Sequence, residues 1–276
     1  MTYRCFFLPV LSGNESPKWR CKYRSFFWWE RDSYIRNQNS ILWCVGSTVP
    51  LLLKRAEPRK IIDDYCKMNN KLFRKFLENT TESDAAHDIA HIERVVKNAE
   101  KICLAESADK EIVTAAAWLH DCVIIPKDHP DRKKASILAA QKAAEFLSLQ
   151  DYPANKIPAV AHAIETHSYS AGLEPKTIEA KIVQDADRLD ALGAIGIARC
   201  FSVGGALNSS MYDPYDPFAK NRELNDSEWS VDHFYVKLFR LPELLNTDTA
   251  KTIARERVEY MKSYLDQLST EIGSSM

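Results

Sequence analysis

The chain has 276 residues, a hydrophobic content of 45% and a net charge of −1. This length is enough to bury one good-sized core, and the near-neutral charge gives no electrostatic reason to expect nucleic acid or a membrane as a partner. Only 8 glycines are present and neither GxGxxG nor GxxxxGKS/T occurs, which argues against a glycine-rich phosphate loop. The 7 cysteines form no CxxC pair, so we expect reduced thiols and a cytoplasmic location.

Residues 1–67 differ in composition from the rest of the chain. They hold 12 basic and 6 acidic residues, which leaves 25 basic and 32 acidic residues in 68–276. The longest apolar run in this segment, residues 41–53, is interrupted by Gly46 and Pro50 and is too short to span a membrane. We therefore predict that residues 1–67 are an N-terminal extension outside the main fold, and that residues 68–276 form one domain.

From Asn69 onward the apolar residues recur at the spacing of helices. In 89–103 they form a stripe, and His91 lies beside it. His91 also stands four residues after His87, so the two could share a helix face and bind a metal as a pair. The alternative gives His91 to the metal and leaves His87 and Asp88 as a cap or a supporting group.

The next predicted helix starts at Asp109 and ends in the sequence Trp-Leu-His-Asp at 118–121. On a continuing helix, His120 and Asp121 would point about 100° apart, so both can reach one ion only if the helix ends or bends there. Pro126 disfavours the helical state at the residue before it and predicts such an end. We expect a metal site at a helix terminus that opens into a loop.

The loop over residues 124–134 is rich in basic side chains. Its members are Lys127, Arg132, Lys133 and Lys134. Basic side chains close behind a metal pair suggest contacts to phosphate, and a solvated connector is the alternative.

Further helices are expected over residues 136–149, 157–166, 177–187, 229–241 and 247–268, with an irregular segment at 209–227. The helix over 157–166 carries His162, and His167 follows five residues later, so the two share a face only if the helix ends between them. The helix over 229–241 presents Lys237. Asp187 ends the 177–187 helix within an apolar run.

Four ordered motifs carry a family resemblance. They read HDIAHIERV at 87–95, LHD at 119–121, THSYS at 166–170 and QDADRLDALGAIGIAR at 184–199. Together they resemble the HD-domain metal-dependent phosphohydrolases, and in particular a subgroup of hydrolases found in bacteria and fungi. The blocks DPFA at 216–219 and DHF at 232–234 look similar as well. The resemblance runs from about residue 69 to about residue 268 and implies an all-α, HD-type helical bundle with an N-terminal extension that is not part of the domain.

The resemblance also implies roles for individual residues. The expected ligands of one divalent ion (Mn, Mg, Co, Fe, Ni or Zn) are His91, His120, Asp121 and Asp187, a set of nitrogen and oxygen donors that suits such ions. The expected catalytic residues are Asp121 and His167. The expected substrate-binding residues are Arg94, Lys127, Arg132, Lys133 and Lys237. The residues expected to support the ligands are His87, Asp88, His162 and Arg188, with Arg188 neutralising nearby carboxylates.

The expected reaction is hydrolysis of a phosphate ester or phosphoanhydride in a small phosphorylated molecule, with nucleotides the favoured class. Some HD hydrolases that act on guanosine alarmones carry a Glu-Asp pair after the HD motif; Ile124 and Ile125 stand there instead and weigh against that substrate. Two alternatives remain. A two-iron oxygenase would use additional histidines around a second metal, and a non-catalytic module would only bind a nucleotide.

Overall fold

The computed structural model describes residues 8–10, 18–20, 69–79, 89–125, 129–168 and 171–274. The chain divides into two compact units, Met1–Arg55 and Ala56–Met276. In the first unit, β1 (Leu8–Val10) and β2 (Lys18–Arg20) pair as antiparallel strands, with Pro9 opposite Trp19. This division falls inside the predicted extension, whose separation from the enzyme fold stays a prediction.

The second unit is all-α, as predicted. After a helical segment at 69–78, its α-helices are α2 (Ile89–Glu106), α3 (Lys110–Leu119), α4 (Ala135–Ser148), α5 (Ile157–His167), α6 (Ile178–Leu189), α7 (Gly193–Ala206), α8 (Asp232–Val236) and α9 (Asp248–Glu271). The 3-10 helices are η1 (Arg132–Lys134) and η2 (Leu238–Leu244). Within the described residues of this unit, the only β-type pairing is an isolated bridge between Ser210 and Trp229.

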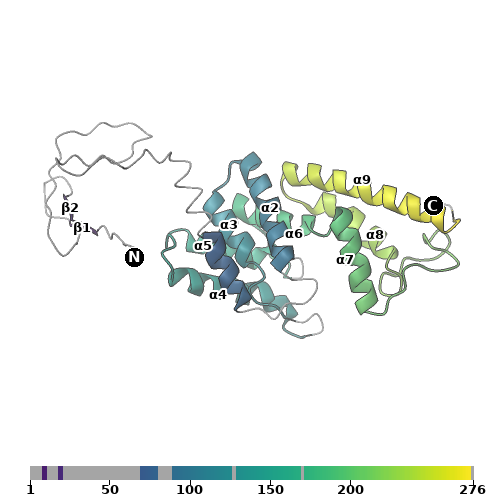
Figure 1. Ribbon diagram of the computed structural model, residues 1–276, viewed down its shortest axis with the longest axis horizontal. Helices are drawn as coiled ribbons and strands as arrows, with labels where there is room; N and C mark the ends of the chain where they lie inside the picture. The colour runs from purple at the N-terminus through teal and green to yellow at the C-terminus, as the bar shows by residue number, and fades with distance from the viewer. Residues whose placement is uncertain are drawn as a thin grey trace. The chain divides into compact units, whose positions relative to one another are not determined.

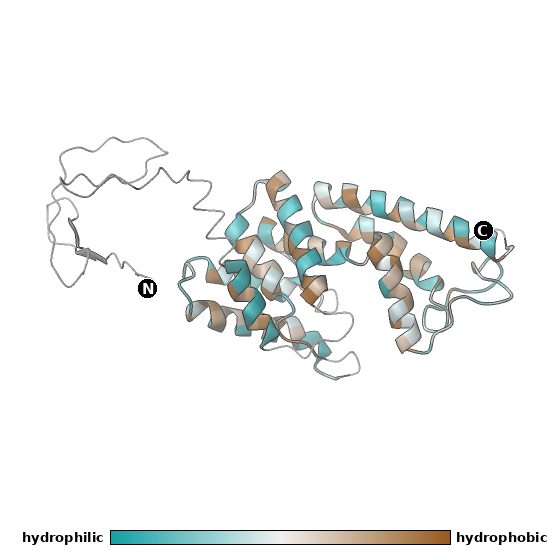
Figure 2. Cartoon of the chain, in the orientation of Figure 1, coloured by the Kyte–Doolittle hydropathy of each residue, from teal (hydrophilic) through white to brown (hydrophobic). Residues whose placement is uncertain are grey.

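The helices α2, α3, α5 and α6 pack on one another around a common core, with α4 against α5 (Figure 1). The long helix α9 runs beside α7 and also contacts α2 and α6. Hydrophilic and hydrophobic residues alternate along α9 in Figure 2, as expected of a helix with one buried face. Its buried residues are Ala250, Ile253, Ala254, Val258, Met261 and Leu265.

A buried carboxylate fastens the start of α9 to α6. Asp185 is fully buried and accepts hydrogen bonds from the backbone nitrogens of Asn246 (2.9 Å) and Thr247 (2.8 Å) and from Thr247 Oγ1 (2.8 Å). Thr247 Oγ1 in turn accepts from the nitrogen of Ala250 (3.3 Å) and caps α9. These hydrogen bonds satisfy Asp185 and hold α9 close to the end of α6.

The chain turns sharply between α6 and α7. Gly193 has φ +74°, a conformation that favours glycine, and an added Cβ would lie 3.2 Å from Arg257 Cγ on α9. The angle between the two helices is 64°. No single helix in the described ranges has the length and apolar character of a membrane span. Only α6 and α7 taken together, as a bent pair, have that length and apolar character.

The predicted single helix over 229–241 is wrong in its detail. Trp229 pairs with Ser210 in a β-bridge, and the N–H groups of Ser230 and Val231 bond to the carbonyls of Ser210 and Met211, each at 2.9 Å. The backbone here follows the preceding loop, and α8 starts only at Asp232. The helix then breaks at Lys237, where φ is −129° and ψ is −56°, and continues as η2. Lys237 therefore lies at a junction and not on the face of a continuous helix.

Candidate metal centre

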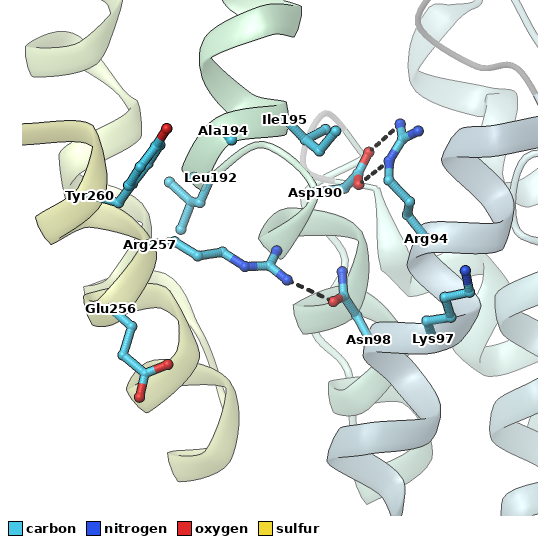
Figure 3. A pocket seen from close by; sticks show the side chains of 11 residues that line it. Arg94, Lys97, Asn98, Asp190, Leu192, Ala194, Ile195, Glu256, Arg257 and Tyr260 are labelled. Atoms are coloured by element: carbon cyan, nitrogen blue, oxygen red, sulfur yellow. Dashed lines mark hydrogen bonds and ion pairs between the residues drawn. The ribbon is translucent and has the colours of Figure 1, made fainter. Parts of the chain in front are cut away.

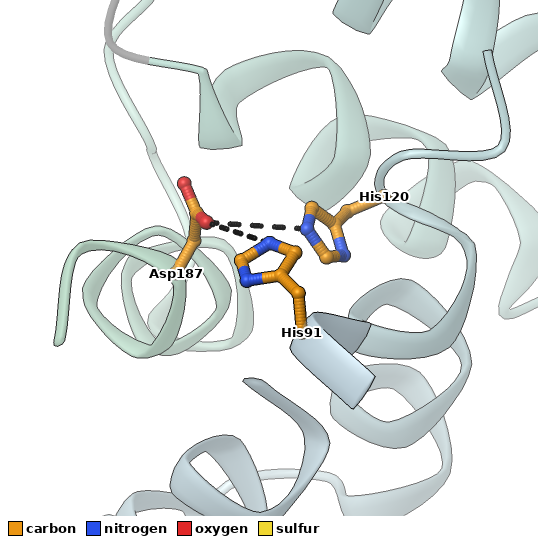
Figure 4. Close-up of side chains that lie close together, drawn as sticks. All are labelled: His91, His120 and Asp187. Atoms are coloured by element: carbon orange, nitrogen blue, oxygen red, sulfur yellow. Dashed lines mark ion pairs between the residues drawn. The ribbon is translucent and has the colours of Figure 1, made fainter. Parts of the chain in front are cut away.

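Three side chains from distant parts of the sequence meet where their helices lie together (Figure 4). His91 comes from α2, His120 directly follows α3, and Asp187 comes from α6. The Oδ1 atom of Asp187 lies 3.4 Å from His91 Nε2 and 4.0 Å from His120 Nε2. These three ligand atoms lie within 4.8 Å of one another, which is close enough to hold one metal ion.

A second group shares His120 and adds Asp121 and His167. Asp121 Oδ2 lies 3.4 Å from His120 Nε2, and its other oxygen, Oδ1, lies 3.5 Å from His167 Nε2. Asp121 Oδ2 is also 3.8 Å from His91 Nε2, so this carboxylate borders both groups. The helix α3 ends at Leu119, which meets the condition that allows His120 and Asp121 to face one point.

The Nδ1 atoms of the three histidines all face acceptors. The Nδ1 atom of His120 lies 2.8 Å from the carbonyl oxygen of Ala117, and that of His167 lies 2.6 Å from the carbonyl oxygen of Ile164. A carbonyl oxygen can only accept, so in both rings Nδ1 carries the proton and Nε2 presents its lone pair to the site when the ring is neutral. This arrangement is typical of histidines that bind metals through Nε2.

The third histidine, His91, faces the carboxylate of Asp190, a contact that the sequence interpretation missed. His91 Nδ1 lies 2.7 Å from Asp190 Oδ2. Arg94 donates to the same carboxylate from Nε (2.7 Å) and Nη2 (3.0 Å), and Arg199 donates from Nη1 (2.5 Å). Burial would raise the pKa of Asp190, but its hydrogen bonds to His91 and Arg94 outweigh it and lower that pKa to about 2. Asp190 is therefore an ionised acceptor that orients His91.

A signal for Asp190 exists in the sequence. It stands three residues after Asp187 and so shares its helix face, just as Arg94 stands three residues after His91. The sequence interpretation had assigned the supporting role to His87 and Asp88, which lie outside the described residues.

The charges of the site compensate one another. Burial would raise the pKa values of Asp121 and Asp187, but the facing imidazoles outweigh burial and hold both pKa values well below the usual range. Burial would lower the pKa of His91, but Asp187 and Asp190 raise it to about 9. The pKa of His167 is raised as well, because its contact with Asp121 outweighs burial. The carboxylates thus stabilise positive charge here, whether it comes from protons or from a metal ion.

One unpartnered nitrogen atom indicates that the site binds a cation. His120 is fully buried, and among the described residues its Nε2 atom has no hydrogen-bond partner. An unsatisfied buried lone pair is costly, and a cation bound there would satisfy it. The mixed nitrogen and oxygen donors fit a divalent first-row metal.

The other predicted residues are placed as follows. Arg132 of η1 donates from Nη1 to the carbonyl of Ile125 (2.7 Å), Lys133 is exposed, and Lys127 lies outside the described residues. His162 faces Glu165 Oε1 through Nδ1 (3.1 Å) and accepts from the nitrogen of Lys176 through Nε2 (3.1 Å).

Both nitrogens of His162 are therefore engaged away from the ligand cluster. Arg188 donates from Nη1 to the carbonyl oxygen of Leu244 (2.5 Å), which ties α6 to the end of η2. This acceptor is neutral, and the expected neutralisation of carboxylates by Arg188 stays a prediction.

Comparisons with known proteins identify the family of the chain. A sequence model of the HD domain matches residues 88–192. The chain is 35% identical over 196 residues to the uncharacterized protein YpgQ of Bacillus subtilis, covering 70% of this chain and 87% of YpgQ. The crystal structure of YpgQ in complex with ADP superposes with a TM-score of 0.57 and 33% identity, covering 75% of this chain and 95% of that one. An HD-superfamily hydrolase of Bacillus thuringiensis superposes with a TM-score of 0.59 and 33% identity, covering 77% and 99%.

Proposed function

Since the chain belongs to the HD-domain family, we propose that it is a metal-dependent phosphohydrolase acting on a small phosphorylated substrate, with nucleotides the favoured class. The observation that carries this proposal is the convergence of imidazole and carboxylate ligand atoms from α2, α3 and α6 within 4.8 Å. The crystallisation of YpgQ with ADP supports a nucleotide as the substrate class. A cytoplasmic location stays a prediction.

His91, His120, Asp121 and Asp187 would hold one divalent ion. The ion would supply a positive charge that polarises a phosphoryl oxygen and lowers the pKa of water. The protein's part is to keep the Nε2 lone pairs aimed at one point, which the acceptors on the Nδ1 atoms achieve.

His167 is suited to accept the proton of the attacking water. Its Nδ1 proton is held by the carbonyl of Ile164, so in the neutral ring Nε2 is the acceptor atom. As a water oxygen forms its bond to phosphorus and the bond to the leaving oxygen breaks, a proton passes to Nε2 of His167. Asp121, whose Oδ1 lies 3.5 Å from Nε2, would stabilise the imidazolium that results.

Basic side chains would neutralise the remaining phosphate charge. We assign this role to Arg94, Lys127, Arg132, Lys133 and Lys237. Arg94 already binds Asp190, so a phosphate that it contacts would be linked to the position of His91. A charge-assisted hydrogen bond to phosphate is about twice as strong as a neutral one.

The test is release of phosphate or pyrophosphate from a panel of nucleotides with added Mn²⁺, Mg²⁺ or Co²⁺. We expect activity with at least one nucleotide, dependent on the metal. No release from any nucleotide with any of these ions would count against the hydrolase and favour a non-catalytic nucleotide-binding module. The second ligand group, which contains His167, is the observation that favours a two-iron oxygenase as the rival. Two irons per chain after anaerobic purification would support that rival.

A further inference from the structure

A groove of about 420 Å³ lies between α2, the α6–α7 junction and α9 (Figure 3). Its lining includes Arg94 and Asp190, which support His91. Among the residues that the structure describes, none of the proposed metal ligands lines it. The groove therefore lies beside the metal centre, and Asp190 both lines the groove and contacts His91. Its volume is in the range of sites for small ligands.

Arg257 of α9 brings a half-buried positive charge to this groove. Its guanidinium donates to the carbonyl oxygen of Leu189 and, from Nη2, to Asn98 Oδ1 at 2.9 Å. Both acceptors are neutral, and no ion pair of Arg257 is found in the described part of the chain. Burial lowers the pKa of this guanidinium. The charge of Asp190 acts on Arg257 only from a distance, and this carboxylate is already hydrogen-bonded to Arg94 and Arg199. An anion bound in the groove would compensate the remaining charge of Arg257.

Two further features make the groove attractive to anions. Lys97 of α2 is exposed at its edge, and the described residues provide no ion-pair partner for it. Asp190 is shared by two guanidinium groups, those of Arg94 and Arg199, so one negative charge faces two positive ones. In Figure 3 the carboxylate of Glu256 extends along α9 and lies apart from Lys97 and Arg94. The local field therefore favours a negatively charged ligand.

The opposite wall is apolar and partly exposed. Tyr260 is 54% exposed and Ile195 is 41% exposed, and both line the groove together with Leu192. An aromatic ring and aliphatic side chains beside a cationic wall suit a ligand with an apolar or planar body and an anionic group. The start of α7 borders the same space and has no side-chain cap, so its first N–H groups are additional donors.

We propose that this groove is a second binding site, which takes the phosphate group of a small phosphorylated ligand against Arg257 and Lys97 and its apolar part against Tyr260 and Ile195. The site does not need the metal ion. The same chemistry is offered by a separate ligand molecule or by the far end of a substrate whose reacting phosphate lies at the metal centre. In either case the ligand contacts Arg94, which holds the carboxylate that orients His91.

The test is isothermal titration of the full chain in EDTA with ADP, inorganic pyrophosphate and adenosine. We expect ADP and pyrophosphate to bind without metal, and adenosine to bind at least about tenfold more weakly than ADP, because it lacks the charge-assisted contacts. Lys97→Glu should weaken ADP binding by about tenfold or more. Lys101→Glu is the matched control, because Lys101 is exposed on the same helix and does not line the groove; it should change binding by less than about threefold.

Arg257→Gln provides a second variant, which retains an amide donor but loses the charge. It should weaken ADP binding as Lys97→Glu does. Binding that disappears in EDTA would place the ligand on the metal ion and overturn the proposal. Equal effects of Lys97→Glu and Lys101→Glu would also overturn it, since they would indicate unspecific charge attraction.

These outcomes do not depend on hydrolysis, so a failure here is distinct from a failure of the proposed function. A non-hydrolysable nucleotide analogue added with Mn²⁺ then shows whether the groove binds a separate ligand molecule or the far end of the substrate. One molecule bound per chain identifies the far end of the substrate, and two molecules identify a separate ligand.

Discussion

Replacement of Asp190 by Asn should weaken metal binding although Asp190 does not itself contact the ion. The amide has the shape of the carboxylate but only one accepting oxygen, while His91 Nδ1, Arg94 and Arg199 all direct donors at this position. One of the NH₂ hydrogens must then face a donor. Outer partners of metal-binding histidines typically contribute about 10- to 100-fold to metal affinity, and we expect a loss of that size here.

The same variant should lose stability. The pKa of Asp190 is about 2 in the folded chain, below the ordinary value of 3.8. This difference corresponds to about 2.5 kcal/mol of stabilisation. Because the folded-state pKa is depressed, the contribution is complete above about pH 4 and is lost as the pH falls towards 2. Breaking a fully buried ion pair costs about 3–5 kcal/mol, and the partial exposure of both arginines places Asp190→Asn at or below the lower end of that range.

The assays are Mn²⁺ titration calorimetry at neutral pH and urea unfolding in EDTA. Asp151→Asn is the control, since Asp151 is exposed and away from these partners. Mn²⁺ affinity within about threefold of the wild type, together with unchanged stability, would refute the role of Asp190.

Four further predictions concern the metal, its pH dependence, the basic loop and the extension. Asp121→Ala should abolish bound metal and activity while the helical circular dichroism persists; full activity would exclude the assignment. Metal affinity should rise from pH 6 to about pH 9, because the raised pKa of His91 means that a proton must leave this ring before the ion binds. Calorimetry in buffers of different ionisation enthalpy should detect the released proton. A metal affinity that is independent of pH would contradict this prediction. The basic loop is tested with single alanine variants of Lys127, Arg132, Lys133 and Lys134. Replacing a residue that contacts phosphate should lower kcat/KM by about tenfold or more without loss of metal, and replacing a solvated residue should lower it by less than about threefold. If all four variants behave as the wild type, the loop is only a connector. A chain beginning at Met68 should unfold cooperatively and keep its turnover; aggregation or a large loss of melting temperature would show that the extension packs on the domain.

The sequence predicted the all-α fold because helix formation and termination leave local signals. Apolar spacing marks α2 to α6, and the end of α3 at Leu119 agrees with the predicted termination before Pro126. The side chains of His91, His120, Asp121 and Asp187 do lie together, and their binding of an ion stays a prediction. The helix predicted over 229–241 was wrong at its start, where Trp229 pairs with Ser210 in a β-bridge, and at Lys237, where α8 ends and η2 follows. The pairing at Trp229 depends on the path of the preceding loop.

The contacts that sequence reasoning missed join residues far apart in the chain. Asp190 contacts His91, which is 99 positions away in the sequence, and Arg257 contacts Asn98, which is 159 positions away. Local spacing places Asp190 on the helix face of Asp187, but it does not identify the distant partner of either Asp190 or Arg257, because these contacts arise from how α6 and α9 pack against α2. Arg94 illustrates the consequence. Its spacing from His91 suggested a contact with a phosphate or an acidic group, but only the packing of α2 against α6 identifies Asp190 as the carboxylate that it binds.

Whether hydrolysis depends on a metal ion held by the proposed ligands can be measured by restoring activity to metal-free protein. Chain stripped with EDTA would be titrated with Mn²⁺ while phosphate or pyrophosphate release from a nucleotide and the bound metal are measured together. We expect release to appear only with metal, to saturate at one ion per chain, and to be absent from Asp121→Ala at the same Mn²⁺ concentration. Release by the stripped protein without added metal, or equal release by Asp121→Ala, would contradict it.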